Sequence, residues 1–395
     1  MREIRPLTEA DVDAAVAIRS FAQWGKNDEE HKRRFAKNVP RTLGSFEDGA
    51  LAAVATMLEL ETYVGGATAA LGGLAGVTTA PTHRRRGHVA ELLRAWFERL
   101  HEKGIGLSGD FPFDPSFYAR YGYQTIINHG KLDLPVGRLP KGNHDAVAVG
   151  ADRFEDLRAI HAAYARRFSL TLTRADEGRD YWQVITAPFW RDQPYDVFLM
   201  DGAYLVIGID ESEEGPGFPK VVVRDHAYSS PRGRASLLAF LADLAGQVEQ
   251  VRIHLPWGDP LLAMWSAQYT SETASYQVRV VDVARALAPL RAGHESRFTA
   301  RLRDDDCPWN DGTFAVELTR DGCSAQRVPG GAATTGARGW HVELGIAAFA
   351  AVLFGAVDPA AALATGLAQG DVQPLVELSR LLAGHPSYIP EADHY

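Results

Sequence analysis

The segment from residue 69 to residue 104 constrains the fold of this chain most strongly. Residues 69–79 are apolar and rich in glycine, as in a buried strand, and Pro81 ends that pattern. Gly104 stands where a long helix would end. Between them, apolar residues recur at the spacing of one helix face, at Val89, Leu92, Leu93, Trp96, Phe97 and Leu100. The segment therefore predicts a strand, a turn and a helix, a unit of α/β folds.

Three consecutive arginines, Arg84, Arg85 and Arg86, precede Gly87 at the start of the predicted helix. The positive end of the helix dipole disfavours cations unless an anion joins them. Unpaired backbone N–H groups and the close approach that Gly87 allows would both serve such an anion. Residues 85–90 thus indicate a pyrophosphate-binding cradle. The alternative is a solvated arginine cluster that caps a surface helix.

The turn lacks the Gly-Lys-Ser/Thr of a P-loop and the Gly-x-Gly-x-x-Gly of a dinucleotide site. It resembles motif A of the GNAT acetyltransferases, Arg/Gln-x-x-Gly-x-Gly/Ala, whose amides hold the pyrophosphate of acetyl-CoA. Arg84 and Gly87 match the motif, but Val89 occupies its last position and Ala90 comes one residue late. The run Ala-Pro-Thr-His-Arg-Arg-Arg-Gly, residues 80–87, is similar to the Eis (enhanced intracellular survival) branch, which shares a non-Gly residue there.

This resemblance implies which residues bind acetyl-CoA. They are expected at the end of the strand, around the turn, at the helix start and before the next helix: Val77, Thr78, Thr79, Arg84, Arg85, Arg86, Gly87, His88, Val89, Ala90, Phe113 and Asp114. Asp114 has an alternative role, because it precedes Pro115 as an N-cap would in a short helix.

A second motif, residues 117–123, reads Phe-Tyr-Ala-Arg-Tyr-Gly-Tyr. GNAT enzymes commonly carry an aromatic-Tyr-x-x-x-Gly-aromatic segment whose Tyr stands near the sulfur of CoA. A phenol with a pKa of about 10 stays protonated at neutral pH and can donate to a thiolate. The resemblance gives the role of general acid to Tyr118. For Tyr121 and Tyr123 we expect packing against the sheet, which is also the alternative for Tyr118.

The sequence ends on Pro386-Ser-Tyr-Ile-Pro390-Glu-Ala-Asp-His-Tyr395. A frayed end is the ordinary expectation, although two prolines stiffen this segment. Eis-like chains end on an aromatic residue whose α-carboxylate acts as the general base, which implies that role for Tyr395. Desolvation would make such a carboxylate a stronger base. Trp24 and Asp110 are further candidates for binding the substrate.

The pattern of elements divides the chain into residues 1–145, 146–288 and 289–395. The first two segments are mixed α/β, and the third places strands before helices, as in an α+β module. The resemblance implies tandem GNAT folds, each a mixed sheet with flanking helices, and a C-terminal sterol-carrier-protein-like α+β domain. Pro231-Arg-Gly-Arg234 lacks the motif A spacing, so the second GNAT fold is expected to be degenerate and without its own CoA.

Charge and composition exclude several classes of protein. The 41 Lys and Arg residues against 50 Asp and Glu give a net charge of -9, which argues against nucleic acid as a partner and suits a cationic substrate. No segment is apolar and long enough for a membrane span or a signal peptide. Cys307 and Cys323 fit neither a disulfide framework nor a metal motif, so we expect a cytoplasmic protein without a metal.

The resulting hypothesis is an N-acetyltransferase that moves the acetyl group of acetyl-CoA to a primary amine by direct attack. By resemblance, the acceptors are aminoglycosides, polyamines or lysine amines, and the protein is a homohexamer. Two alternatives remain. The C-terminal domain could carry an apolar ligand in a binding protein, or the tandem GNAT folds could belong to a tRNA-dependent aminoacyl transferase.

Overall fold

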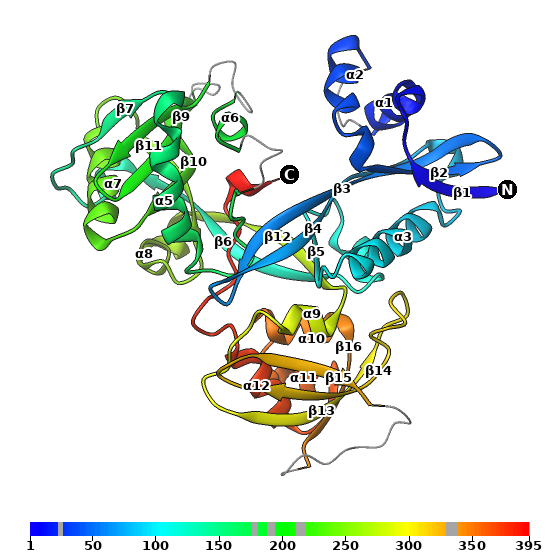
Figure 1. Cartoon of the computed structure of the whole chain (residues 1–395). Coiled ribbons are helices and arrows are strands. Elements are labelled where there is room, and N and C mark those ends of the chain that lie inside the picture. The colour runs from blue at the N-terminus through cyan, green and yellow to red at the C-terminus, as the bar shows by residue number, and fades with distance from the viewer. Residues whose placement is uncertain (23–26, 176–180, 188–193, 211–218, 329–338, 395) are drawn as a thin grey trace.

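The computed structural model describes residues 1–22, 27–175, 181–187, 194–210, 219–328 and 339–394. These residues form a twelve-stranded sheet and a five-stranded sheet. The large sheet extends through the two upper lobes in Figure 1, and the small sheet lies in the lower lobe. The strand order of the large sheet is β1-β2-β3-β4-β5-β12-β6-β11-β10-β9-β8-β7.

The first lobe contains the predicted strand, turn and long helix. Its strands are β1 Arg2–Pro6, β2 Thr42–Glu47, β3 Ala50–Val64, β4 Ala67–Thr79, β5 Leu107–Asp110 and β6 Gln124–Pro135. Its helices are α1 Val12–Phe21, α2 Glu29–Ala36, α3 His88–Glu102 and α4 Pro115–Ala119. The predicted apolar stripe of α3 is buried from Leu92 to Leu100. It packs closely over Gly72 of β4, where a Cβ atom would meet Leu100 and Trp96.

The second lobe repeats the alternation of strands and helices. Its strands are β7 Val147–Val149, β8 Asp196–Met200, β9 Ala203–Asp210, β10 Lys220–Tyr228, β11 Gln250–Pro256 and β12 Thr270–Val280. Its helices are α5 Phe154–Ala165, α6 Tyr181–Thr186, α7 Pro231–Asp243 and α8 Pro260–Tyr269. Strands β8 and β9 form a hairpin that turns at Asp201-Gly202, with Met200 paired to Ala203.

Strand β12 joins the two upper lobes into one sheet. It lies between β5 and β6, and Gln277 of β12 pairs with Asp110 of β5. On its other side, β6 pairs with β11 from Pro135↔Gln250 onward. A strand from the second segment is thus inserted among the strands of the first segment, which no local sequence pattern indicates.

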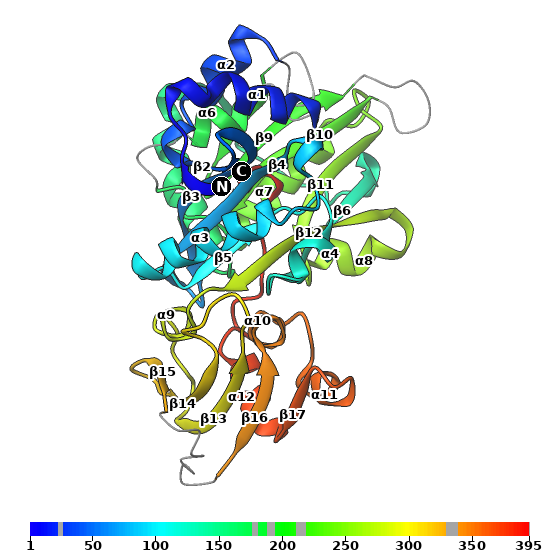
Figure 2. The same ribbon diagram turned by 90° about the vertical axis from the view of Figure 1, so that its right-hand side faces the viewer.

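The lower lobe has the expected α+β architecture. Its strands are β13 Ser296–Arg303, β14 Gly312–Leu318, β15 Cys323–Arg327, β16 His341–Gly345 and β17 Ala368–Gly370, in the order β15-β14-β13-β16-β17. Its helices are α10 Ile346–Leu353, α11 Pro359–Ala364 and α12 Val372–Arg380, and α9 Val283–Leu287 precedes it. Figure 2 shows this lobe beneath the large sheet. Arg279 of β12 connects to it through a buried ion pair with Asp304, at 2.6 Å.

None of the helices among the described residues is both long and apolar enough to cross a membrane.

The C-terminal tail, residues 386–394, runs from the lower lobe up between the two upper lobes (Figure 1). It lies along the segment after α5. Ser169 N donates to Pro386 O (3.0 Å), and Tyr388 N donates to Ser169 O (2.9 Å). Farther along, Thr171 Oγ1 donates to Tyr388 O at 2.6 Å. The described part of this tail is therefore held by hydrogen bonds rather than frayed.

A buried charge network fixes the far end of the tail. The Arg174 guanidinium bonds to both carboxylate oxygens of Asp225, at 2.6 and 3.1 Å, and its Nε donates to Asp393 Oδ1 at 2.9 Å. All three side chains are at most 1% exposed. Burial alone would raise the pKa of Asp225, but the charge and hydrogen bonds of Arg174 outweigh it and hold that pKa below its ordinary value.

Removing the cation of this network should cost more stability than removing one anion. Arg174→Met leaves two buried carboxylates without a cation, and we expect a loss of about 3–5 kcal/mol in the free energy of unfolding. Asp393→Asn keeps the bidentate pair with Asp225 and should cost roughly 1–3 kcal/mol. Urea unfolding of both variants measures the difference. The exposed pair of Arg297 and Glu317 supplies the control, because Arg297→Met should be nearly neutral. Equal losses for Arg174→Met and Asp393→Asn would contradict the claim that Arg174 compensates the charge of both carboxylates.

Candidate active site

Strands β4 and β5 separate at one point of the large sheet. They pair in parallel from Leu71↔Leu107 to Leu74↔Asp110, where β5 ends while β4 continues to Thr79. Just beyond that point β4 holds a bulge, because its pairing with β3 shifts between Ala75 and Thr78. Gly76 in the bulge has a φ of 57°. The edge of residues 75–79 that β5 would otherwise cover is therefore left without a strand partner in the described structure.

Arg19 of α1, which the sequence analysis missed, supports the bulge from behind. Its Nη1 donates to Gly76 O at 3.2 Å, and a Cβ atom at Gly76 would collide with the same guanidinium. Burial lowers the pKa of Arg19. Arg19 and Gly76 are 57 positions apart and meet only because α1 packs against β4. No pattern among neighbouring residues in the sequence could have revealed this contact.

A cavity of about 800 Å³ opens between the end of β4, the start of α3 and helix α4. All the residues expected to bind acetyl-CoA line it except Asp114. Five more residues join them that were not predicted to bind the cofactor, namely Ala22, His83, Phe117, Arg120 and Tyr121. Asp114 instead caps α4, and its carboxylate accepts from Ser116 N at 2.9 Å.

The start of α3 faces this cavity with its backbone open. Gly87 precedes the helix with a φ of 90°, and Arg85 also has a positive φ, of 61°. No described side chain caps the helix. A Cβ atom at Gly87 would have only Arg2 Nη1 near it, at 3.6 Å, so a ligand can approach the backbone closely. The unpaired N–H groups of this turn are available to an anion.

The three arginines have different partners. Arg86 Nη1 pairs with Glu47 Oε2 at 2.9 Å, and Arg84 lies over the ring of Phe21 with its Cζ 5.8 Å from the centroid. Arg85 forms no ion pair with any described residue. Its charge, at the positive end of a helix, is thus available to a bound anion.

His88 anchors the helix start with its side chain. Its Nδ1 shares a hydrogen bond with Ser45 Oγ at 2.8 Å, and the ring is buried. Burial lowers the pKa of His88 and, with the charge of Arg2, favours the neutral ring. The part of His88 that a ligand in the cavity can reach is therefore its backbone N–H.

Tyr118 of α4 is buried among other aromatic rings. Its ring centroid lies 5.0 Å from that of Phe117 and 5.9 Å from that of Tyr123. Burial, followed by the Asp110 carboxylate, raises the pKa of Tyr118 well above the ordinary value. The phenol therefore keeps its proton at neutral pH. Tyr123 instead packs in the core, and its hydroxyl bonds to Ser108 Oγ at 2.8 Å.

Asp110 ends β5 at the point where β4 and β5 separate. It is 2% exposed, and neither of its carboxylate oxygens has a hydrogen-bond partner among the described residues. Burial raises the pKa of Asp110 to about 8. Gln277, its neighbour across the ladder on β12, donates from Nε2 to Pro115 O and Thr125 Oγ1, but its Oε1 is also unpartnered. Three oxygen atoms on neighbouring strands thus lack a hydrogen-bond partner among the described residues.

The tail reaches this same strand end. The ring of Phe111, which follows Asp110, contacts Tyr276 of β12 at 4.8 Å and His394 of the tail at 3.5 Å between centroids. Two of the predicted site residues, Trp24 and Tyr395, lie outside the described residues.

The second lobe contains a parallel pair that separates in the same way. Strands β10 and β11 pair only from Lys220↔Gln250 to Val222↔Arg252, although both continue. The tail passes through this gap. Glu391 pairs with His254 of β11 at 3.0 Å and with Arg224 of β10 at 3.6 Å. The chain itself therefore occupies the place that is open in the first lobe.

The helix start beside that second gap is closed as well. Ser230 caps α7, and its hydroxyl accepts from Gly233 N at 3.0 Å. Gly233 packs against the backbone of Gly202 so closely that no Cβ atom would fit. Unlike Gly87, it cannot offer its backbone to a ligand.

The buried carboxyl of Asp110 should give stability a specific pH dependence. Its pKa of about 8 in the folded protein lies above the ordinary 3.8, so the folded state holds this proton more tightly than the unfolded state. The stability that this tightly held proton gives the folded state should be lost as the pH rises from about 4 to about 8. Asp110→Asn should therefore gain stability relative to the unmodified protein at about pH 8 but not at about pH 5. Urea unfolding at both pH values tests this, and a pH-independent difference would contradict it.

Comparison with known families matches the three parts of the chain separately. Residues 3–126 match an acetyltransferase (GNAT) domain, residues 178–285 match a second acetyltransferase (GNAT) domain, and residues 283–390 match a sterol carrier protein domain. An uncharacterized N-acetyltransferase of Streptomyces griseus is 26% identical over 336 residues, which cover 77% of this chain and 80% of that protein. Another, from Streptomyces coelicolor, is 28% identical over 323 residues, covering 74% and 76%.

Solved structures share the fold along the whole chain. A GCN5-related N-acetyltransferase from Anabaena variabilis superposes with a TM-score of 0.86 at 16% identity, covering 100% of both chains. Eis1 from Mycobacterium abscessus gives a TM-score of 0.78 at 18% identity, again over 100% of both chains. With the domain matches and the relatives, the expected fold class is confirmed. The chain is a GNAT acetyltransferase that uses acetyl-CoA and combines two GNAT domains with a sterol carrier protein domain.

Proposed function

We propose that the chain acetylates a primary amine by direct attack at the splay of β4 and β5. The observation that supports this most is the uncapped start of α3, which opens with Gly87 into the 800 Å³ cavity next to that splay. We also propose that the protein belongs to the Eis branch, on the strength of residues 80–87. Its domains would then be residues 1–145, 146–288 and 289–395, and its assembly a homohexamer.

The cradle would hold the pyrophosphate of acetyl-CoA. The N–H groups of residues 85–90 would donate to the phosphate oxygens, and the Arg85 guanidinium would supply the compensating charge. On β4, the open edge of residues 77–79 would donate to the thioester oxygen, where negative charge develops. When bound, acetyl-CoA would supply the activated acetyl group, and these residues would hold that group in position.

Tyr118 would act as the general acid. Its hydroxyl donates a proton to the departing sulfur, and its raised pKa ensures that the proton is present beforehand. The rings of Phe113 and Phe117 contact the Tyr118 ring edge-on, at 5.8 and 5.0 Å between centroids, and help to hold it in place.

Asp110 and Gln277 would recognise the acceptor amine. Their three unpartnered oxygens need donors, and a primary ammonium group carries three N–H donors. A cation would also lower the raised pKa of Asp110 and so stabilise its charged form. By resemblance, the acceptor is an aminoglycoside, a polyamine or a lysine amine, and Trp24 would line its site.

The amine must lose a proton before it attacks. By resemblance, the Tyr395 α-carboxylate would take that proton. The contact of His394 with Phe111, next to Asp110, supports this role because it brings the tail to the end of β5. We further propose a cytoplasmic location, since Cys307 and Cys323 are both free thiols in the fold.

Loss of the unpaired arginine should weaken cofactor binding. Arg85→Ala removes a charge-assisted phosphate contact worth about 1.5–3 kcal/mol, so the Kd of acetyl-CoA should rise roughly 10- to 100-fold. Calorimetric titration measures this. Arg232→Ala is the matched control, because Arg232 is an exposed arginine in the first turn of α7 in the closed second domain. An unchanged Kd in Arg85→Ala would contradict the proposal that Arg85 contacts the pyrophosphate of acetyl-CoA.

Loss of the phenol proton should lower turnover without affecting cofactor binding. Tyr118→Phe keeps the ring among its aromatic neighbours, so kcat should fall by about 10²–10⁴-fold while the Kd of acetyl-CoA stays nearly constant. Thiol release with a polyamine acceptor gives the rate. Tyr123→Phe should lose stability through its Ser108 bond but keep kcat. A normal kcat in Tyr118→Phe would assign the proton to another donor.

A further inference from the structure

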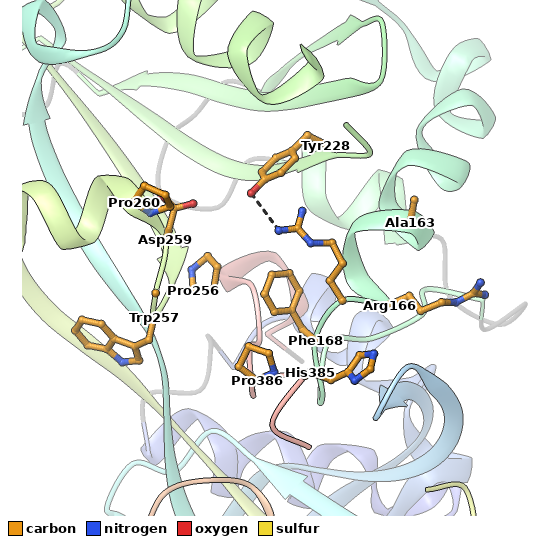
Figure 3. Close-up of a pocket in the computed structure, with 13 residues that line it drawn as sticks. Ala163, Arg166, Phe168, Tyr228, Pro256, Trp257, Asp259, Pro260, His385 and Pro386 are labelled. Atoms are coloured by element: carbon orange, nitrogen blue, oxygen red, sulfur yellow. Dashed lines mark hydrogen bonds between the residues drawn. The ribbon is translucent and has the colours of Figure 1, made fainter. Parts of the chain in front are cut away.

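We propose that the second GNAT domain has a ligand site of its own, which binds a small organic anion with a flat apolar part. The site is a cavity of about 520 Å³ at the outer end of the gap between β10 and β11 (Figure 3). It is separate from the acetyl-CoA cavity, with which it shares no lining residue.

The walls of the cavity come from four segments. Tyr228 ends β10, residues 256–260 connect β11 to α8, residues 163–168 span the end of α5 and the segment after it, and residues 384–386 lead into the tail. In Figure 3, Trp257, Asp259 and Pro260 lie along one side, with Tyr228 and Phe168 across from them. Rings and prolines therefore form most of the surface, which suits a flat apolar group.

The cavity also holds a cation without an anionic partner. Arg167 lies over the ring of Tyr228 at 4.9 Å and over that of Phe168 at 5.5 Å, and its Nη2 is 3.5 Å from Tyr228 Oη. No carboxylate in the described part of the chain lies within ion-pair distance of it. Most donors of this guanidinium are thus free for a carboxylate or phosphate.

The nearby acidic group does not cancel that charge. Asp259 is buried and pairs with Arg234 of α7 at 2.8 Å, and the same oxygen accepts from Leu261 N at 2.9 Å. The neighbouring Arg166 lies instead over the ring of Tyr63, at 5.5 Å. Of the two arginines, Arg167 is therefore the one that contacts the rings of the cavity.

The ligand cannot be bound in the way the first domain binds acetyl-CoA. Ser230 and Gly233 close the start of α7, and the tail fills the inner part of the gap. What remains is the smaller outer cavity, where the partner for an anion is Arg167, just after the end of α5, rather than a helix start. This favours a compact anion over a nucleotide.

Phenyl phosphate is a suitable probe, because it joins an anion to a flat ring. Calorimetric titration is done on the whole protein with saturating CoA, which blocks the first cavity. We expect saturable binding at one site, weakened roughly tenfold or more by Arg167→Gln. The control is Arg158→Gln, which changes an exposed arginine of α5 that pairs with Glu155 and does not line the cavity, and it should bind within about twofold of the unmodified protein. Inorganic phosphate should bind more weakly than phenyl phosphate, since it lacks the ring.

Three results would overturn the proposal. They are no saturable binding when CoA is present, equal binding by Arg167→Gln, and equal affinity for inorganic phosphate. Both arginines are exposed, so neither variant should unfold, and thermal melting confirms this for each. Because CoA is present throughout, the outcome does not depend on the proposed roles of Tyr118 or Asp110.

Discussion

The guanidinium of Arg174 connects the parts of the molecule that no sheet connects. It pairs with Asp225 of the second domain and with Asp393 of the tail in an environment from which water is excluded. Leu172, two residues earlier, forms a bridge to Thr62 of β3 and donates to Asp393 Oδ2. The path of the tail toward Phe111 depends on this anchor. Without its cation, two buried carboxylates would repel each other, and the end of the tail at Asp393 would lose its anchor.

The two GNAT domains show opposite uses of the same geometry. Each has a parallel strand pair that separates partway along its length, followed by a helix whose start faces the gap. In the first domain Gly87 leaves the backbone of that helix open. In the second, Ser230 caps the helix, Gly233 is packed shut, and the tail enters the gap. The second domain has thereby become a support that holds the tail in place beside the first.

Local patterns in the sequence predict local structure well. The stripe from Val89 to Leu100 indicates α3 because helix periodicity needs only neighbouring residues, and the order of strand, turn and helix places the arginines at the cavity. The insertion of β12 beside β5, and with it the meeting of Gln277 and Asp110, depends on pairing across more than 160 positions. The contact of Arg19 with Gly76 cannot be predicted from the sequence for the same reason. Long-range pairing of this kind leaves no periodic trace in either segment.

The central claim is that this chain binds acetyl-CoA at one helix start and not at the other. Hydrogen–deuterium exchange with and without acetyl-CoA tests both helix starts in one sample. The account predicts slower exchange at the amides of residues 85–90 when the ligand is present, and no change at residues 229–234. Protection at residues 229–234, or none at residues 85–90, would contradict it.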